Sequence, residues 1–126
     1  MMKSYLSALL LAIVFVSPAL AAHQHPEKWY QDKWCHEKGG QQEVILPDKT
    51  RADCITTTNA VEVEFGRNWA ESIGQSLFYS LQTGKRAGIV LVLESVDDRR
   101  YWYRLNSVIQ EFKLPIDAWA TGEGAP

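Results

Sequence analysis

Apolar and polar residues follow two distinct periodicities along this chain, and these predict where its strands and helices lie. Residues 60–65 alternate strictly, with apolar side chains on one face and Glu62 and Glu64 on the other. This period of two is typical of a strand with one buried face. Residues 88–94 are instead apolar almost throughout, which favours a central strand buried on both faces.

Helix signals occur between and around these strands. Asn68 is a favourable N-cap residue, and Glu71 follows it at the spacing of a capping box. An apolar stripe with helical spacing then runs through Trp69, Ile73, Leu77 and Leu81. The complete pattern predicts helices at residues 26–38, 68–82 and 98–112, and strands at residues 42–46, 51–56, 60–65, 88–94 and 116–120.

The order of these elements predicts a single α/β domain. Three consecutive strands with short turns form an antiparallel meander, and the strand–helix–strand connection after it requires a parallel crossover. The expected sheet is therefore mixed, in the order αβββαβαβ. We expect a leader at residues 1–21, the domain at residues 22–122 and a tail at residues 123–126.

The N-terminal residues have the features of a cleavable secretory signal peptide. Lys3 supplies a positive charge, an apolar run of about 12 residues follows, and Ala19-Leu20-Ala21 has the small-x-small pattern of a cleavage site. The run is shorter than the ~20 residues that a membrane-spanning helix needs. We therefore expect cleavage after Ala21, export to the periplasm or the cell exterior, and no membrane attachment afterwards.

Charge and cysteine content narrow the function further. The 126 residues carry a net charge of −2, and the leader contributes only Lys3, so the mature chain is slightly more acidic. This balance gives no sign of the basic surface that favours nucleic-acid binding. The two cysteines, Cys35 and Cys54, would enter an oxidising compartment, so we expect them to form a disulfide.

Three carboxylates are expected to meet on the meander. If the turn between its second and third strands is centred near residues 57–58, Asp53 faces Glu62, and Glu64 lies on the same face. Such an oxygen cluster suits Mg²⁺, Mn²⁺ or Ca²⁺ and, without a cation, raises the pKa of at least one carboxyl group. The alternative is an ordinary solvated sheet face, where glutamates also alternate.

The helix that follows carries a polar line. Glu71, Gln75 and Tyr79 are spaced four apart, so they share one face of a helix that is otherwise apolar. Gly74 is unfavourable within a helix and is expected to permit the close approach of a neighbouring segment. This row of polar residues is unusual on a buried helix, although it also fits the solvent-exposed edge of an amphipathic helix.

Taken in order, these features resemble the PD-(D/E)XK nuclease superfamily, in particular its RecB-type branch. The pattern of that family is an early Glu, then Asp, then Glu-x-Lys on a strand, then Gln-x-x-x-Tyr on the next helix. The matching residues here are Glu43, Asp53, Glu62-Val63-Glu64, and Gln75 with Tyr79. The resemblance spans residues 43–94 and implies a restriction-endonuclease-like fold around a metal site.

The resemblance also implies roles for these residues. Asp53 and Glu62 would hold Mg²⁺ or Mn²⁺, with Glu43 assisting. The metal would lower the pKa of a bound water and neutralise charge on the phosphodiester. Gln75 and Tyr79 would position the nucleotide or that water.

One residue departs from the family pattern. Glu64 stands where the family usually has lysine, so it would act as a base or as an additional metal ligand. Some restriction enzymes of the superfamily carry Glu at this place and still cleave. The missing cation would orient the attacking water or stabilise the phosphorane, and the candidates to compensate for it are Lys85 and Arg67.

The implied function is an exported, metal-dependent nuclease-like hydrolase that cleaves phosphodiester bonds of DNA. The alternative is an inactive nuclease-fold domain that serves as a binding or accessory module for a protein partner. Its interaction surface would consist of exposed aromatic residues, namely Trp29, Trp34, Trp102 and Tyr103. The alternative is that these rings belong to the core or to ordinary helix packing, which is favoured for Trp102. A third hypothesis is a transition-metal site formed by histidines near the N-terminus, namely His23, His25 and His36.

Overall fold

The computed structural model describes residues 13–14 and 22–126. The expected signal peptide, apart from Ile13 and Val14, therefore lies outside the described residues. The helices in this part of the chain are α1 (Glu27–Glu37), α2 (Trp69–Thr83) and α3 (Arg99–Glu111), with short 3-10 helices η1 (Gly66–Asn68) and η2 (Val96–Asp98). The strands are β1 (Gln41–Ile45), β2 (Arg51–Ile55), β3 (Asn59–Phe65), β4 (Arg86–Val92) and β5 (Ile116–Thr121).

The five strands form one mixed sheet in the order β1-β2-β3-β4-β5. The pairs β1–β2 and β2–β3 are antiparallel, whereas β3–β4 and β4–β5 are parallel. Helices α2 and α3 make the two crossovers that parallel neighbours require. The expected α/β class and mixed sheet are confirmed.

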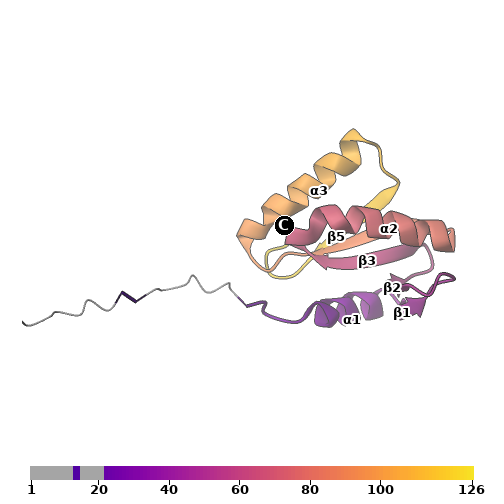
Figure 1. Ribbon diagram of the computed structural model, residues 1–126, viewed down its shortest axis with the longest axis horizontal. Coiled ribbons are helices and arrows are strands. Elements are labelled where there is room, and N and C mark those ends of the chain that lie inside the picture. Colours follow the sequence, from indigo (N-terminus) through magenta and orange to yellow (C-terminus); the bar gives the residue numbers. More distant parts are fainter. Residues whose placement is uncertain (1–12, 15–21) are drawn as a thin grey trace, which may run out of the picture.

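The sheet carries α1 on one face and α2 and α3 on the other (Figure 1). Beneath α1, the core consists of Tyr30, Trp34, Val61, Val63, Phe65, Val90 and Val92, with Trp119 beside them. Beneath α2 and α3, it consists of Ala87, Ile89, Leu91, Leu93, Leu105 and Ile116. Every residue of β4 after Arg86 is buried, as its unbroken apolar sequence predicted.

Trp34 lies in the core, so the prediction that it belongs to an exposed aromatic surface is wrong. It is 7% exposed, and its ring centroid lies 5.1 Å from that of Trp119. Trp29 and Tyr103 do remain exposed. Trp102 is partly buried and packs against the core beneath α2 and α3.

Helix α2 lies against the sheet through two small polar residues. Ser72 and Ser76 are fully buried, and their hydroxyl groups donate to backbone carbonyls one turn earlier, those of Trp69 and Ile73. Leu81 was expected on the buried stripe but is 80% exposed. A step of four residues overshoots one helical turn by about 40°, so the stripe that begins at Trp69 has rotated away from the sheet at Leu81.

Asn68 is the N-cap residue of α2, as expected, but the capping box is absent. The Asn68 side chain makes no capping hydrogen bond, because a 3-10 turn precedes the helix and the amide donates instead to Glu64 Oε1 at 2.9 Å. Gly74 is not a point of close approach, since a Cβ added there would meet nothing within 4 Å.

The C-terminal residues are bound to the domain rather than forming a free tail. Gly124 N–H donates to Leu93 O at 2.8 Å, and the Arg99 guanidinium donates to the carbonyls of Gly124 and Ala125. Among the described residues, no helix is long and apolar enough to cross a membrane.

Candidate functional site

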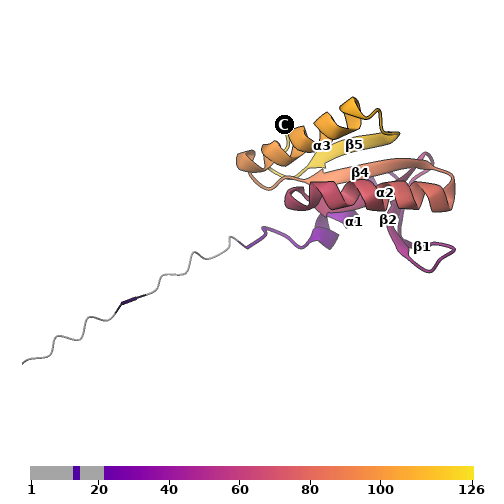
Figure 2. The same ribbon diagram turned by 45° about the horizontal axis from the view of Figure 1, so that its top comes forward.

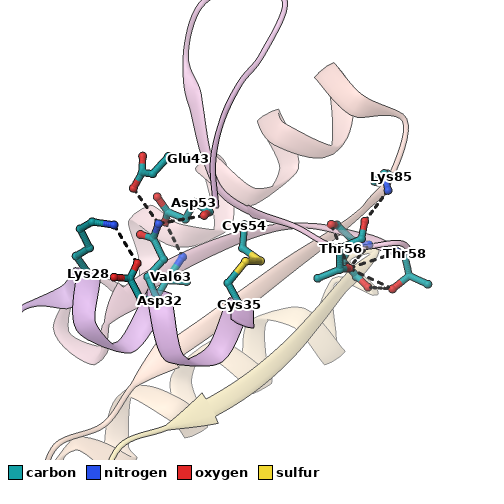
Figure 3. The surroundings of a disulfide bond; sticks show 12 residues. Lys28, Asp32, Cys35, Glu43, Asp53, Cys54, Thr56, Thr58, Val63 and Lys85 are labelled. Atoms are coloured by element: carbon teal, nitrogen blue, oxygen red, sulfur yellow. Dashed lines mark hydrogen bonds and ion pairs between the residues drawn. A yellow bond between two sulfur atoms is a disulfide. The ribbon is translucent and has the colours of Figure 1, made fainter. Parts of the chain in front are cut away.

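The candidate site lies where the backbone pairing between β2 and β3 ends. Their pairs are Cys54–Val61 and Ile55–Ala60, and the β1–β2 hairpin then turns away from the rest of the sheet (Figure 2). Beyond this point, the Val63 N–H donates to Asp53 Oδ2 at 2.8 Å (Figure 3). The Asp53 carboxylate thus replaces the strand backbone as acceptor, which fixes this side chain between the two strands.

Asp53, which is half-buried, and Glu62, which is buried, form a pair of carboxyl groups. Glu62 is 4% exposed, and its Oε2 has no hydrogen-bond partner among the described residues. Burial, with the neighbouring charge of Asp53, raises the pKa of Glu62 to about 10. Burial also raises the pKa of Asp53, although the hydrogen bond from Val63 opposes this. Without a cation, the pair therefore retains a proton at neutral pH.

Glu27 and Glu64 form a second pair of carboxyl groups next to the first. Burial, and then a hydrogen bond with Glu64, raise the pKa of Glu27 to about 8. Glu64 Oε1 also accepts the Phe65 N–H at 3.0 Å. Glu27 was absent from the residues predicted for the site. Its signal in the sequence is a four-residue spacing from Gln31, which places both side chains on one face of α1.

Gln31 connects α1 to both strands of the hairpin. Its side chain is buried, and its amide nitrogen donates to Glu43 Oε1 at 2.8 Å and to Asp53 O at 3.0 Å. Glu43 has a φ of 52°, a left-handed conformation that is uncommon for a residue with a Cβ. This conformation directs Glu43 to the site, and its charge raises the pKa of Asp53. Strained residues of this kind cluster at functional sites.

The expected disulfide between Cys35 and Cys54 is present and holds this arrangement together. Its sulfur atoms are 2.07 Å apart, and it joins the last turn of α1 to β2 directly after Asp53 (Figure 3). Helix α1 carries Glu27 and Gln31, so the bond fixes one wall of the site to the other.

Helix α2 contributes Tyr79 from the opposite face of the sheet. Tyr79 is buried, and burial together with the charge of Glu62 raises its pKa above the ordinary value. Gln75 is half-buried and makes no hydrogen bond to the described residues of the site, and Glu71 is exposed. The structure thus brings Tyr79 to the predicted carboxylates and leaves Gln75 at the rim.

The prediction that Lys85 replaces the missing lysine is wrong. Its ammonium group donates to the carbonyls of Thr56 and Thr57, at the start of β3, whereas Glu64 lies near the end of that strand. In Figure 3, Lys85 and Asp53 lie on opposite sides of the disulfide. Arg67 is exposed in η1, three residues after Glu64.

Lys28 is a cation close to the site that the sequence did not indicate. It pairs with Asp32 at 2.9 Å, and this contact, followed by the charge of Glu43, raises its pKa. Its position on α1 places it beside the hairpin (Figure 3).

The three histidines have separate surroundings, which argues against a common metal site. His23 bonds to Glu94 and stacks on Phe65, His25 stacks on Trp29, and His36 lies in the last turn of α1. The prediction of a shared transition-metal site is therefore wrong.

The chemistry of the carboxylate site fits a hard divalent cation. Within residues 22–126, no three His, Cys, Asp or Glu side chains are grouped as a preformed metal site. The oxygen donors nevertheless include one buried atom without a partner and two pairs joined by hydrogen bonds. A cation can replace the protons that join each pair, and oxygen is the ligand that Mg²⁺ and Mn²⁺ prefer.

Compared with family models, with curated proteins and with solved structures, the chain gave no match.

Proposed function

We propose that the mature domain is an exported, metal-dependent nuclease-like hydrolase of PD-(D/E)XK type that cleaves phosphodiester bonds of DNA. The observation that carries the proposal is the Asp53–Glu62 pair, in which the buried Glu62 Oε2 has no hydrogen-bond partner in the part of the chain that the structure describes. A buried carboxyl group with a strongly raised pKa costs stability, which favours a functional role over a structural one. The disulfide fits an exported protein.

Each residue of the site has a role in this proposal. Asp53 and Glu62 would hold Mg²⁺ or Mn²⁺ in place of their shared proton, with Glu43 beside them. The bound metal supplies positive charge that stabilises the phosphodiester transition state and favours ionisation of water. The Glu64 carboxylate, hydrogen-bonded to its protonated neighbour Glu27, would accept the proton of the attacking water.

The proposed hydrolysis forms one bond to phosphorus and breaks another. The water oxygen forms a bond to phosphorus, the bond from phosphorus to the leaving sugar oxygen breaks, and solvent protonates that oxygen. The Tyr79 hydroxyl group orients the Glu62 carboxylate. Gln75, at the rim, contacts the nucleotide.

A second candidate function is an inactive nuclease fold that binds a protein partner. It is favoured by Glu64 in place of the family's lysine and by the engagement of Lys85 at the other end of β3. Trp29, which is 43% exposed, would belong to its interaction surface.

DNA cleavage by the purified mature domain separates these two functions. Plasmid and single-stranded DNA are incubated with the oxidised domain in Mg²⁺, in Mn²⁺ and in EDTA. The proposal predicts cleavage that needs the metal and disappears in Asp53→Ala and Glu62→Ala. The matched control is Glu71→Ala on the exposed face of α2, which is expected to cleave like the wild type. If a folded protein cleaves DNA in neither metal, the nuclease function is refuted and the binding module is favoured.

A further inference from the structure

Arginines gather at the start of α3, although the chain as a whole is acidic. Arg99, Arg100 and Arg104 all lie within the first six residues of the helix. The N-terminal end of a helix carries a partial positive charge, so cations are unfavourable there. A cluster of arginines at this end therefore calls for a reason other than helix stability.

Arg99 has a structural reason, because it holds the C-terminal residues through their carbonyls. Arg100 and Arg104 make no such contact with the C-terminal residues. Both are exposed, and neither forms a salt bridge with a described carboxylate. Asp98, in the preceding turn, accepts the backbone N–H groups of Glu94 and Ser95.

Arg100 and Arg104 both lie over one aromatic ring. The Arg100 guanidinium carbon is 4.8 Å from the Tyr101 ring centroid, and that of Arg104 is 5.8 Å from it. Arg100 Nη2 also donates to the Tyr101 hydroxyl at 2.9 Å. Stacking of this kind holds a guanidinium in place, while its remaining N–H groups can bind phosphate in a bidentate way.

Tyr101 places these cations beside the candidate site. A Cβ on Gly66 would come within 2.9 Å of Tyr101 Cδ2, so the ring packs directly on Gly66. Gly66 is two residues beyond Glu64, at the end of the strand that carries the site carboxylates. The exposed Arg67 lines the same shallow hollow of about 110 Å³ as Gly66 and Tyr101. Glu94 and Asp98 line it as well, and their carboxylates are engaged by His23 and Tyr30 and by backbone N–H groups, respectively.

We propose that Arg100 and Arg104, held over Tyr101, together with Arg67 form the surface that binds the phosphate backbone of the DNA substrate next to the site. This inference rests on the proposed nuclease function. Charge complementarity selects the partner, because the acidic site repels a polyanion and the arginines at its edge attract it. The surface sets affinity rather than sequence preference, since backbone contacts carry no sequence information.

The test measures binding of a fluorescein-labelled DNA duplex by anisotropy, with the oxidised mature domain, in Ca²⁺, at several NaCl concentrations. Each lost phosphate contact reduces the slope of log affinity against log salt by about 0.9. We therefore expect Arg100→Gln/Arg104→Gln to bind at least tenfold more weakly, with the slope reduced by about 2. Arg100→Lys/Arg104→Lys keeps both charges and is expected to retain the wild-type slope.

The matched control is Lys38→Gln/Lys113→Gln, which removes the same charge elsewhere. Lys38 lies over the Trp34 ring, and Lys113 is exposed just beyond the C-terminal end of α3, the opposite end of that helix from the arginines. This control is expected to bind DNA within twofold of the wild type. Equal weakening by the control would overturn the inference.

The outcomes also separate this inference from the proposed function. If Arg100→Gln/Arg104→Gln binds DNA like the wild type while Asp53→Ala still abolishes cleavage, the arginine surface does not bind the substrate, but the nuclease function is supported. If the wild-type domain neither binds nor cleaves DNA, the proposed function fails and the surface with it.

Discussion

Replacing Glu62 with glutamine tests the electrostatic description of the site without any assumption about substrate. Glutamine has the same shape, remains neutral at every pH, and its amide can donate to Asp53 as the protonated carboxyl group does. Glu71→Gln on the exposed face of α2 is the matched control. In EDTA, we expect Glu62→Gln to stabilise the fold at neutral pH.

The size of the effect follows from the pKa of Glu62. In the unfolded chain this carboxyl group ionises above its ordinary pKa of 4.5, whereas in the fold it keeps its proton to about pH 10. The folded state therefore binds more protons, and stability falls as pH rises through this window. The loss is about 1.4 kcal/mol per pH unit, or about 3 kcal/mol at pH 7. This is a large part of the ~5–15 kcal/mol that stabilises a small domain.

Urea unfolding followed by tryptophan fluorescence between pH 4.5 and 8 measures the effect. Wild type and Glu62→Gln are expected to be equally stable near pH 4.5. The variant is expected to become more stable by about 3 kcal/mol at pH 7, while Glu71→Gln follows the wild type. Parallel curves for wild type and Glu62→Gln, or a wild-type stability that rises from pH 5 to pH 8, would refute the reasoning.

Three further variants test the packing of the disulfide and the helices by unfolding in urea. Cys35→Ser/Cys54→Ser removes a bond that closes a loop with a sequence separation of 19. We expect it to cost about 3 kcal/mol, and a loss under 1 kcal/mol would contradict this. Gly40→Ala is expected to destabilise by about 1–3 kcal/mol, because its Cβ would lie 2.6 Å from Cys54 Sγ. Gly74→Ala, with open space around it, should instead stabilise by about 1 kcal/mol, and the opposite order would contradict the packing.

Much of the sheet could be predicted from the sequence because its signals are local. The alternation around Glu62 and the turn at residues 57–58 together placed Asp53 next to Glu62, and the structure has them in contact. The unbroken apolar run likewise identified β4 as a central strand.

The rest of the site depends on tertiary packing that the sequence does not display. Glu27 and Gln31 reach the carboxylates because α1 folds back over the sheet, fixed by the disulfide at its other end. Glu43 depends on a left-handed backbone within a strand, which no propensity predicts. The role predicted for Lys85 was wrong because its distance from Glu64 along the sequence does not show which end of β3 it contacts.

Calorimetric titration of Mn²⁺ into the oxidised mature domain at pH 7 tests most directly whether the paired carboxyl groups hold a metal. The titration is run in two buffers with different ionisation enthalpies, which counts the protons released. Because Glu62 and Glu27 retain protons at this pH, the wild type is expected to bind Mn²⁺ and to release at least one proton. Asp53→Asn and Glu62→Gln are expected not to bind. Binding without proton release, equal binding by these variants, or no binding by the wild type would contradict the metal site.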